Sequence, residues 1–256
     1  MARIISTCMT VVLFSLMSSN THADSFGVTL RYWFTEESIP GATQVNEIFA
    51  TVLEDERTEV PAVTLRWSPD FWEDHDILLS YFKLDPERTA TTLVAVSVPG
   101  TFIEADAATD RSDLELLIRS RVNENFFFYY GLRLIEAEVG IDILTDPPQR
   151  QLVQQDWTLV EVGLGTSVPV SENGRHSLFA NVIGGYGRFE DTLSNSGMVT
   201  SSSSENGHTI DLNFGYQYTI NQTASFSLRY RDWASYIDGD PAIDSAGIDL
   251  GITFNF

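Results

Sequence analysis

Hydrophobic residues alternate with polar or small residues along several segments of the chain, and this period of two constrains the fold more than any other feature. The clearest segment is 210–218. Its hydrophobic residues are Ile210, Leu212, Phe214, Tyr216 and Tyr218, and they alternate with Asp211, Asn213, Gly215 and Gln217. Successive side chains of a β-strand point to opposite faces, so this segment predicts a strand with one apolar face and one polar face.

The same alternation, at different strengths, marks ten segments. They are 27–34, 61–67, 77–84, 114–122, 126–134, 158–164, 178–186, 210–218, 224–233 and 247–256. In 77–84 the two faces are too similar to tell apart. The pattern predicts an all-β chain of about ten strands, with eight or twelve strands as the alternatives.

The connectors between these segments alternate between short and long. The short ones are 68–76, 123–125, 168–175 and 219–223, and the long ones are 35–59, 85–113, 135–156, 188–207 and 237–246. Transmembrane barrels have short periplasmic turns and longer outer loops. We therefore predict a single antiparallel up-and-down transmembrane β-barrel with both termini on the periplasmic side. A soluble β-sandwich is the alternative fold, although its loops need not divide by length.

The N-terminal 23 residues predict a secretory signal peptide. Arg3 precedes a mostly apolar stretch, 4–17, and small and polar residues follow it up to Ala23. The stretch is too short to span a bilayer comfortably. Cleavage after Ala23 leaves 24–256 as the barrel domain and removes Cys8, the one cysteine, so neither a disulfide nor a Cys-ligated metal is expected.

Composition excludes three classes of protein. A hydrophobic fraction of 43% excludes an intrinsically disordered acidic chain. Beyond the N-terminus the sequence has no uncharged apolar run of roughly 18 or more residues, which excludes a bundle of membrane-spanning helices. The 15 Lys and Arg against 36 Asp and Glu give a formal charge of −21, and a chain so acidic is no general nucleic-acid binder.

The last ten residues resemble the terminal strand of Gram-negative outer-membrane β-barrels. They read Gly-Ile-Asp-Leu-Gly-Ile-Thr-Phe-Asn-Phe and end, as such strands usually do, in a phenylalanine. The resemblance implies that this strand is the signal read by the barrel-assembly machinery, through Ile248, Leu250, Ile252, Phe254 and Phe256. It identifies the general class and no subfamily. Omptin proteases are also similar in strand number, but they carry an acidic pair and an Asp-His pair at the outer rim. Here only His208 lies near that rim.

Aromatic residues gather at the ends of the predicted strands. Trp67, Tyr216 and Tyr218 fall on the apolar faces near the periplasmic ends, as expected of an interfacial girdle. Trp33, Trp157 and Trp233 fall near the outer ends, but the alternation turns them inward. They are expected either in the outer girdle or in the core.

The polar faces of the strands collect charged residues. If the apolar faces meet lipid, the lumen holds Arg31, Arg66, Arg119, Arg121, Arg133, Arg229 and Arg231 with Glu115, Glu161, Asp211 and Asp249. An arginine on the lipid face would cost about 2 to 4 kcal/mol near the midplane, so this segregation is required. The first interpretation is an ion-pair network that fills most of the bore, because carboxylates pair bidentately with guanidinium groups. The second is a narrow anion-preferring path lined by the excess of three positive charges.

The predicted outer loops are acidic. With the acids at the strand ends they carry 24 Asp or Glu against Arg57, Arg88, Arg111, Arg150 and Arg188. Such a surface attracts cations, and divalent ions could bridge it to lipopolysaccharide phosphates. No loop has the ligand spacing of a calcium loop, so a simple solvated acidic surface is the alternative. Residues 91–103 are too apolar for a free loop, and we expect an outer hairpin, a lid over the lumen or an extra strand pair.

The sequence predicts no enzyme, no catalytic residues and no cofactor. His75 and His176 fall at the predicted short periplasmic turns, and His208 and Asp211 point to opposite faces of their strand because their separation is odd. The expected role is a surface or structural interaction, with outer-membrane lipid and lipopolysaccharide as partners and an extracellular ligand that the sequence does not identify. A narrow small-solute channel and a rim-active hydrolase are the alternative functions.

Overall fold

The computed structural model describes residues 24–38, 56–84, 89–95, 102–143, 149–195, 198–237 and 239–256, and the predicted signal peptide lies outside these ranges. The described residues contain no helix that could span a membrane. The strands are β1 (Ser25–Ser38), β2 (Glu56–Ser68), β3 (His75–Leu84), β4 (Thr89–Ala95), β5 (Phe102–Arg121), β6 (Phe126–Ile143), β7 (Gln149–Pro169), β8 (His176–Asn195), β9 (Met198–Thr219), β10 (Ala224–Ile237) and β11 (Asp240–Asn255).

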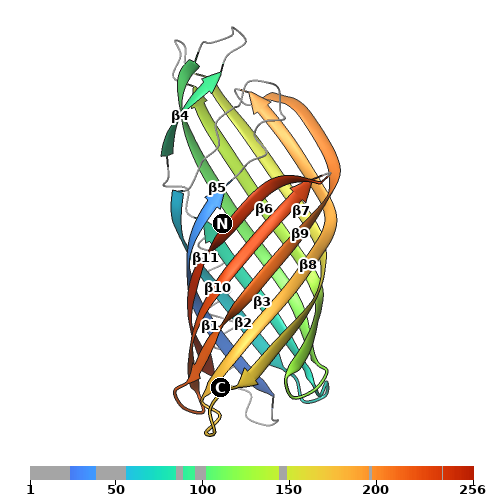
Figure 1. Cartoon of the computed structure of the whole chain (residues 1–256). Helices are drawn as coiled ribbons and strands as arrows, with labels where there is room; N and C mark the ends of the chain where they lie inside the picture. The colour runs from blue at the N-terminus through green and yellow to red at the C-terminus, as the bar shows by residue number, and fades with distance from the viewer. Residues whose placement is uncertain are drawn as a thin grey trace.

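Ten of these strands close into an antiparallel up-and-down barrel (Figure 1). Each pairs with its neighbours in the chain, β1 pairs with β11, and β3 pairs with β5 past the intervening β4. The predicted all-β barrel of about ten strands is confirmed. Closure gives every wall strand a hydrogen-bonded neighbour on both sides, whereas a sheet with free edges leaves backbone N–H and C=O groups unpaired.

β4 adds a hairpin to one end of the wall. It pairs with the first residues of β5, from Thr89 opposite Ala108 to Ala95 opposite Phe102. Figure 1 shows this hairpin at the top, above the ring of strands. Of 91–103 the structure describes 91–95 and 102–103, and these residues pair as two antiparallel strands at the end of the wall.

The four connectors that the sequence predicts to be short all lie at the opposite end of the barrel. They are 69–74, 122–125, 170–175 and 220–223, close to the predicted ranges. The Phe26 backbone N–H donates to the Phe256 carbonyl oxygen at 3.2 Å, so β1 starts and β11 ends here too. Gly174 adopts a positive φ of 65°, which the turn after β7 requires and glycine accepts without strain. We call this end of the molecule the short-turn end.

Several strands extend much further than the sequence predicts. The prediction of long connectors over 135–156, 188–207 and 237–246 is wrong, because β6, β7, β8, β9 and β11 continue through most of these ranges as paired strands. Beyond the membrane both faces of a strand can be polar. The alternation that reveals a strand then disappears while its hydrogen bonding continues.

The outer surface of the barrel carries an apolar belt, and we use this name for the exposed hydrophobic side chains of its middle. They include Leu30, Phe34, Leu114, Leu116, Leu132, Leu134, Val160, Val162, Leu164, Val182, Leu212, Phe214, Leu228, Ile248, Ile252 and Phe254. The residues between them along each strand point into the barrel, as the alternation predicts. An apolar surface of this extent suits contact with hydrocarbon rather than water.

Candidate functional site in the barrel lumen

A buried ion-pair cluster occupies the lumen, with Arg133 of β6 at its centre. The Arg133 side chain has no exposed surface, and its Nη2 lies 2.5 Å from Asp113 Oδ2. Its Nη1 lies 3.6 Å from Asp211, 3.7 Å from Glu161 and 4.0 Å from Glu115. One guanidinium group therefore holds together carboxylates from β5 and β7, which flank β6, and from β9, which lies three strands away.

Two further arginines complete this cluster. Arg111 forms a fork on Asp113, with Nε at 2.9 Å and Nη2 at 3.1 Å from its two oxygens. Arg231 holds Asp211, with Nη2 2.5 Å from Oδ2. Such paired geometry is what allows ionised groups to remain in a dry interior, since removing an unpaired charge from water is very costly.

Aromatic side chains pack directly on the guanidinium groups. The Arg111 Cζ lies 4.1 Å from the Trp233 ring centre, and that of Arg133 lies 5.0 Å from the same ring. Arg231 lies 4.8 Å from Trp33. The larger core cluster around them contains Trp33, Val60, Phe82, Ile135, Trp157, Leu159, Phe189, Trp233, Ala242 and Ile243. Trp33, Trp157 and Trp233 are thus core residues, one of the two arrangements expected for them.

A second ion-pair group lies beside the first. Asp249 is almost fully buried, and Arg229 Nη2 lies 2.7 Å from its Oδ2. Arg31 Nη1 lies 3.7 Å from the same oxygen. Asp249 therefore shares its charge between two arginines, whereas the Arg133 cluster has more acids than arginines.

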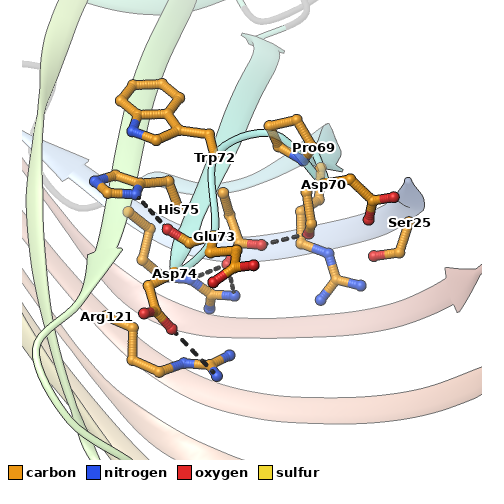
Figure 2. Close-up of a pocket in the computed structure, with 12 residues that line it drawn as sticks. Ser25, Pro69, Asp70, Trp72, Glu73, Asp74, His75 and Arg121 are labelled. Carbon is orange, nitrogen blue, oxygen red and sulfur yellow. Dashed lines mark hydrogen bonds and ion pairs between the residues drawn. The ribbon is translucent and has the colours of Figure 1, made fainter. Parts of the chain in front are cut away.

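The lumen near the short-turn end is more open. A cavity of about 260 Å³ is bordered by Arg31, Arg66, Arg119 and Arg229. Arg66 and Arg119 also border a wider pocket of about 750 Å³, which the turn between β2 and β3 surrounds (Figure 2). Arg119 forms an ion pair with Asp76, and Arg66 Nη2 donates to Asn255 Oδ1 at 2.8 Å.

Arg121 does not belong to the buried network in which the sequence analysis placed it. Its side chain is 56% exposed and lies 3.9 Å from Asp74 at the rim of the wider pocket. Arg121 is the last residue of β5, so its side chain emerges where the wall ends (Figure 2).

Sequence reasoning missed three members of the network. Arg111 and Asp113 fell in a predicted connector, but they continue the inward face of β5 at even separations from Glu115, a signal that could have found them. Asp76 fell in a predicted turn and is the second residue of β3. Among the residues that the structure describes, the lumen thus holds seven arginines, with Arg111 in place of Arg121, and six acids, with Asp76 and Asp113 added. The excess of positive charge is 7 − 6 = 1, not three.

The remaining predicted residues lie on the outer surface. Trp67 stacks on Phe26 with ring centres 6.2 Å apart, close to the short-turn end. Tyr216 is hydrogen-bonded through its hydroxyl to His176 Nδ1, and the Tyr218 ring lies 5.0 Å from the His176 ring. Of the C-terminal residues, Ile248, Ile252, Phe254 and Phe256 are exposed, and Leu250 is half-buried.

His208, the one histidine predicted near the outer rim, lies on the outer face of β9. Its ring stacks on the Tyr236 ring at 4.8 Å, whereas Asp211 is buried in the lumen. The two residues are therefore on opposite sides of the wall, as their odd separation predicts. Within the described ranges, no group of three or more His, Cys, Asp or Glu side chains could hold a metal ion.

Comparison with known proteins identifies the fold. No protein-family model matches the chain, and no curated protein has a matching sequence. The outer membrane protease OmpT of Escherichia coli matches in structure with a TM-score of 0.54 and 11% identity, over 93% of this chain and 99% of that one. The translocator domain of the autotransporter NalP from Neisseria meningitidis matches with a TM-score of 0.53 and 11% identity, over 100% and 96%. The chain has the fold of Gram-negative outer-membrane β-barrels.

Proposed function

We propose that this chain resides in the outer membrane as a closed barrel and acts by binding at its outer surface. The observation that carries the proposal is the environment of Arg133. This side chain is fully buried, is held by acids from three strands and is covered by the fully buried Trp233 ring. A solute crossing the lumen would have to separate these pairs and strip them of their partners, which costs several kcal/mol for each stranded charge.

The membrane placement rests on the apolar belt. The orientation rests on the strand extensions and the β4–β5 hairpin, which project beyond the belt at the end opposite the short turns. The short-turn end faces the periplasm in this proposal, together with both ends of the barrel, and the β4–β5 hairpin faces outward. The C-terminal strand serves as the assembly signal, and its exposed Phe254 and Phe256 face the lipid and the assembly machinery. The predicted signal peptide supplies the export step.

The outer surface above the belt carries a row of acids whose negative field attracts cations. Glu136 lies opposite Asp156, and Asp156 lies opposite Glu190, so three exposed carboxylates form one row across β6, β7 and β8. Only Arg188, which lies 2.9 Å from Glu190, forms an ion pair with a member of this row among the described residues. The row is not a built metal site, but divalent cations gathered by its negative field can bridge it to the phosphates of lipopolysaccharide. We propose lipopolysaccharide as the partner of this acidic row.

Catalysis has less support. A rim-active hydrolase would need a base and a nucleophile that share a face, and His208 is stacked on Tyr236 on the outer side of the wall. We propose that the chain is not an enzyme. Hydrolysis of lipid A or of a peptide panel by the purified barrel, lost in His208→Ala, would contradict this.

Planar bilayers test the closed lumen. Purified protein reconstituted in KCl should give no stable unitary conductance. A stable conductance whose ion selectivity changes in Arg133→Ala or Arg229→Ala would reject the closed barrel and favour the narrow channel instead.

Lipopolysaccharide binding tests the acidic row. Binding to vesicles that contain the protein should need Ca²⁺ or Mg²⁺ and should weaken severalfold in the variant Glu136→Gln, Asp156→Asn, Glu190→Gln. Glu172→Gln, an exposed acid at the short-turn end, is the matched control and should leave binding unchanged. Equal binding by the wild type, the triple variant and Glu172→Gln would count against the proposed partner. Binding that is unchanged when a chelator removes the divalent cations would do so too.

A further inference from the structure

The charged residues that line the cavity of about 260 Å³ in the lumen are all positive. Its charged lining residues, among the residues that the structure describes, are Arg31, Arg66, Arg119 and Arg229. The rest of its wall is mostly hydroxyl and amide side chains, such as Thr64, Ser227 and Asn255. Its size corresponds to about eight or nine water molecules at their volume in the liquid. The cavity therefore has donors on many sides and no carboxylate on its wall.

Nearby acids neutralise only half of this charge. Asp76 forms an ion pair with Arg119, and Asp249 lies 2.7 Å from Arg229 and 3.7 Å from Arg31. Arg66 bonds to the neutral side chain of Asn255. Four arginines thus face two acids.

The buried parts of these arginines also lack partners. The Arg31 side chain is only 10% exposed, and its Nε has no hydrogen-bond partner among the described residues. The same holds for Nε of Arg66 and of Arg229. A buried donor without an acceptor is costly, and an uncompensated guanidinium group costs more. The cavity would be stabilised by an acceptor that carries negative charge.

The cavity adjoins a wider pocket on the side of the short-turn end. It shares Arg66 and Arg119 with the pocket of about 750 Å³ at the short-turn end (Figure 2). That pocket is lined by three arginines and four acids. Asp76 pairs with Arg119 and Asp74 lies 3.9 Å from Arg121, while Asp70 and Glu73 are the two further acids that an entering anion must pass. On the other side the Arg133 cluster closes the lumen. A ligand could enter from the short-turn end and could not pass through.

We propose that this cavity, lined by Arg31, Arg66, Arg119 and Arg229, binds a small oxyanion of the phosphate type that enters from the short-turn end. Planar guanidinium groups match the spacing of phosphate oxygens and can donate two hydrogen bonds each. The surrounding hydroxyl and amide groups can complete the shell around an anion of varied size. The phosphate group comes either from free inorganic phosphate or from the headgroup of a lipid at the periplasmic surface.

Titration with inorganic phosphate tests the proposal directly. The full barrel in zwitterionic micelles should bind phosphate saturably, measured by calorimetry at low chloride. Arg31→Gln and Arg66→Gln should each weaken binding about tenfold or more, the effect of losing one charged hydrogen-bond donor. Arg175→Gln removes an exposed arginine at the same end but outside the cavity, and binding should persist. Absent saturation, or equal weakening by all three variants, would overturn the proposal.

Competition then separates the two sources. Phosphatidylglycerol added to the micelles would displace inorganic phosphate if a lipid headgroup enters the cavity, and this displacement should be lost in Arg66→Gln. If phosphatidylglycerol leaves phosphate binding unchanged, the site selects the free anion. Displacement that persists in Arg66→Gln would mean that the lipid competes elsewhere, and would contradict a headgroup in the cavity.

Thiol labelling reports the charge of the cavity in a way that does not depend on affinity. In a Cys8→Ser background, Ser227→Cys places a thiol on the cavity wall. An anionic methanethiosulfonate reagent should react with it faster than a cationic one, by about tenfold or more in a focused positive field. Ser203→Cys, which is exposed and lies opposite Asp191, should show the reverse preference. A faster reaction of Ser227→Cys with the cationic reagent would overturn the proposal even if a phosphate-binding variant were misfolded.

Discussion

Replacing Arg133 with methionine should destabilise the barrel more than any change to a surface ion pair. Methionine keeps the approximate length of the side chain and removes its charge. Glu161 loses the one ion-pair partner that it has among the described residues, and Glu115 loses its nearest guanidinium group. Asp113 and Asp211 keep Arg111 and Arg231. The change therefore strands two buried carboxylates and leaves two others paired.

The expected cost follows from this count. Breaking a buried ion pair by removing one partner typically costs about 3 to 5 kcal/mol, because the other charge remains buried without compensation. The contact of Arg133 with the Trp233 ring, 5.0 Å away, adds about 0.5 to 2 kcal/mol. Uptake of a proton by one stranded carboxyl group limits the total. We expect a loss of about 3 to 5 kcal/mol in the free energy of unfolding.

Urea unfolding in phospholipid vesicles measures this loss, with tryptophan fluorescence as the signal, since Trp157 and Trp233 are fully buried. Arg188→Gln is the control. Arg188 and Glu190 form an exposed pair, with side chains 66% and 52% accessible, and breaking it should cost less than about 1 kcal/mol. The double variant Arg133→Met, Glu161→Gln should recover part of the loss, because it removes one of the stranded charges. If Arg133→Met and Arg188→Gln unfold at the same urea concentration, the cluster does not stabilise the closed lumen and the reasoning is refuted.

Three other changes test separate parts of the structure. Leu132→Arg puts a charge on the lipid face of β6 and should cost about 2 to 4 kcal/mol in vesicle unfolding, whereas Leu132→Ile should be nearly neutral. Gly187→Ala should cost about 1 to 3 kcal/mol because a Cβ there would lie 1.9 Å from the Thr158 carbonyl oxygen; Gly184→Ala, with its nearest atom 3.8 Å away, should not. Burial raises the pKa of Asp191 on the extension of β8, because the folded protein favours the neutral carboxyl group. The stability that this neutral group contributes is therefore complete below about pH 4 and is lost as the pH rises through the folded-state pKa. Asp191→Asn should remove this decline, which unfolding at pH 4 and pH 7 would show as a difference below about 1 kcal/mol.

The centres of the wall strands could be predicted because lipid enforces a contrast between the two faces. In 210–218 every outward residue is apolar and every inward residue is polar or small, and the register of β9 with β8 and β10 preserves this division. The same rule placed Arg133, Glu161 and Asp211 inward. A one-residue slip would have exposed these charges to hydrocarbon, so the sequence tolerates only one register there.

The extensions of the strands could not be predicted for the complementary reason. Above the apolar belt both faces of β6 and β7 contact water or polar groups, so Glu136 and Asp156 on the outer face look like loop residues. Arg111 and Asp113 were assigned to a connector for the same reason, although they point inward and pair with each other. The alternation within one strand also could not predict which acid each arginine pairs with. Arg133 and Asp211 are on strands that are not adjacent, and only closure of the ring brings them within 3.6 Å.

The uneven division of charge between the two halves of the lumen is the feature that stability alone does not explain. A filled barrel needs its interior charges paired, and the Arg133 cluster achieves this with acids from three strands and with rings over the guanidinium groups. The cavity toward the short-turn end has the same supply of inward positions, yet they carry Thr64, Ser227 and Asn255 where acids could stand. Under either hypothesis, that the cavity is only structural filler or that it holds an anion, Ser227→Asp beside Arg31 and Arg229 should stabilise the barrel in phosphate-free buffer by adding the missing countercharge. The two hypotheses differ in what the change does to phosphate binding. If the cavity holds an anion, the same change should abolish phosphate binding while the unfolding free energy in phosphate-free buffer rises, so that stability and binding move in opposite directions.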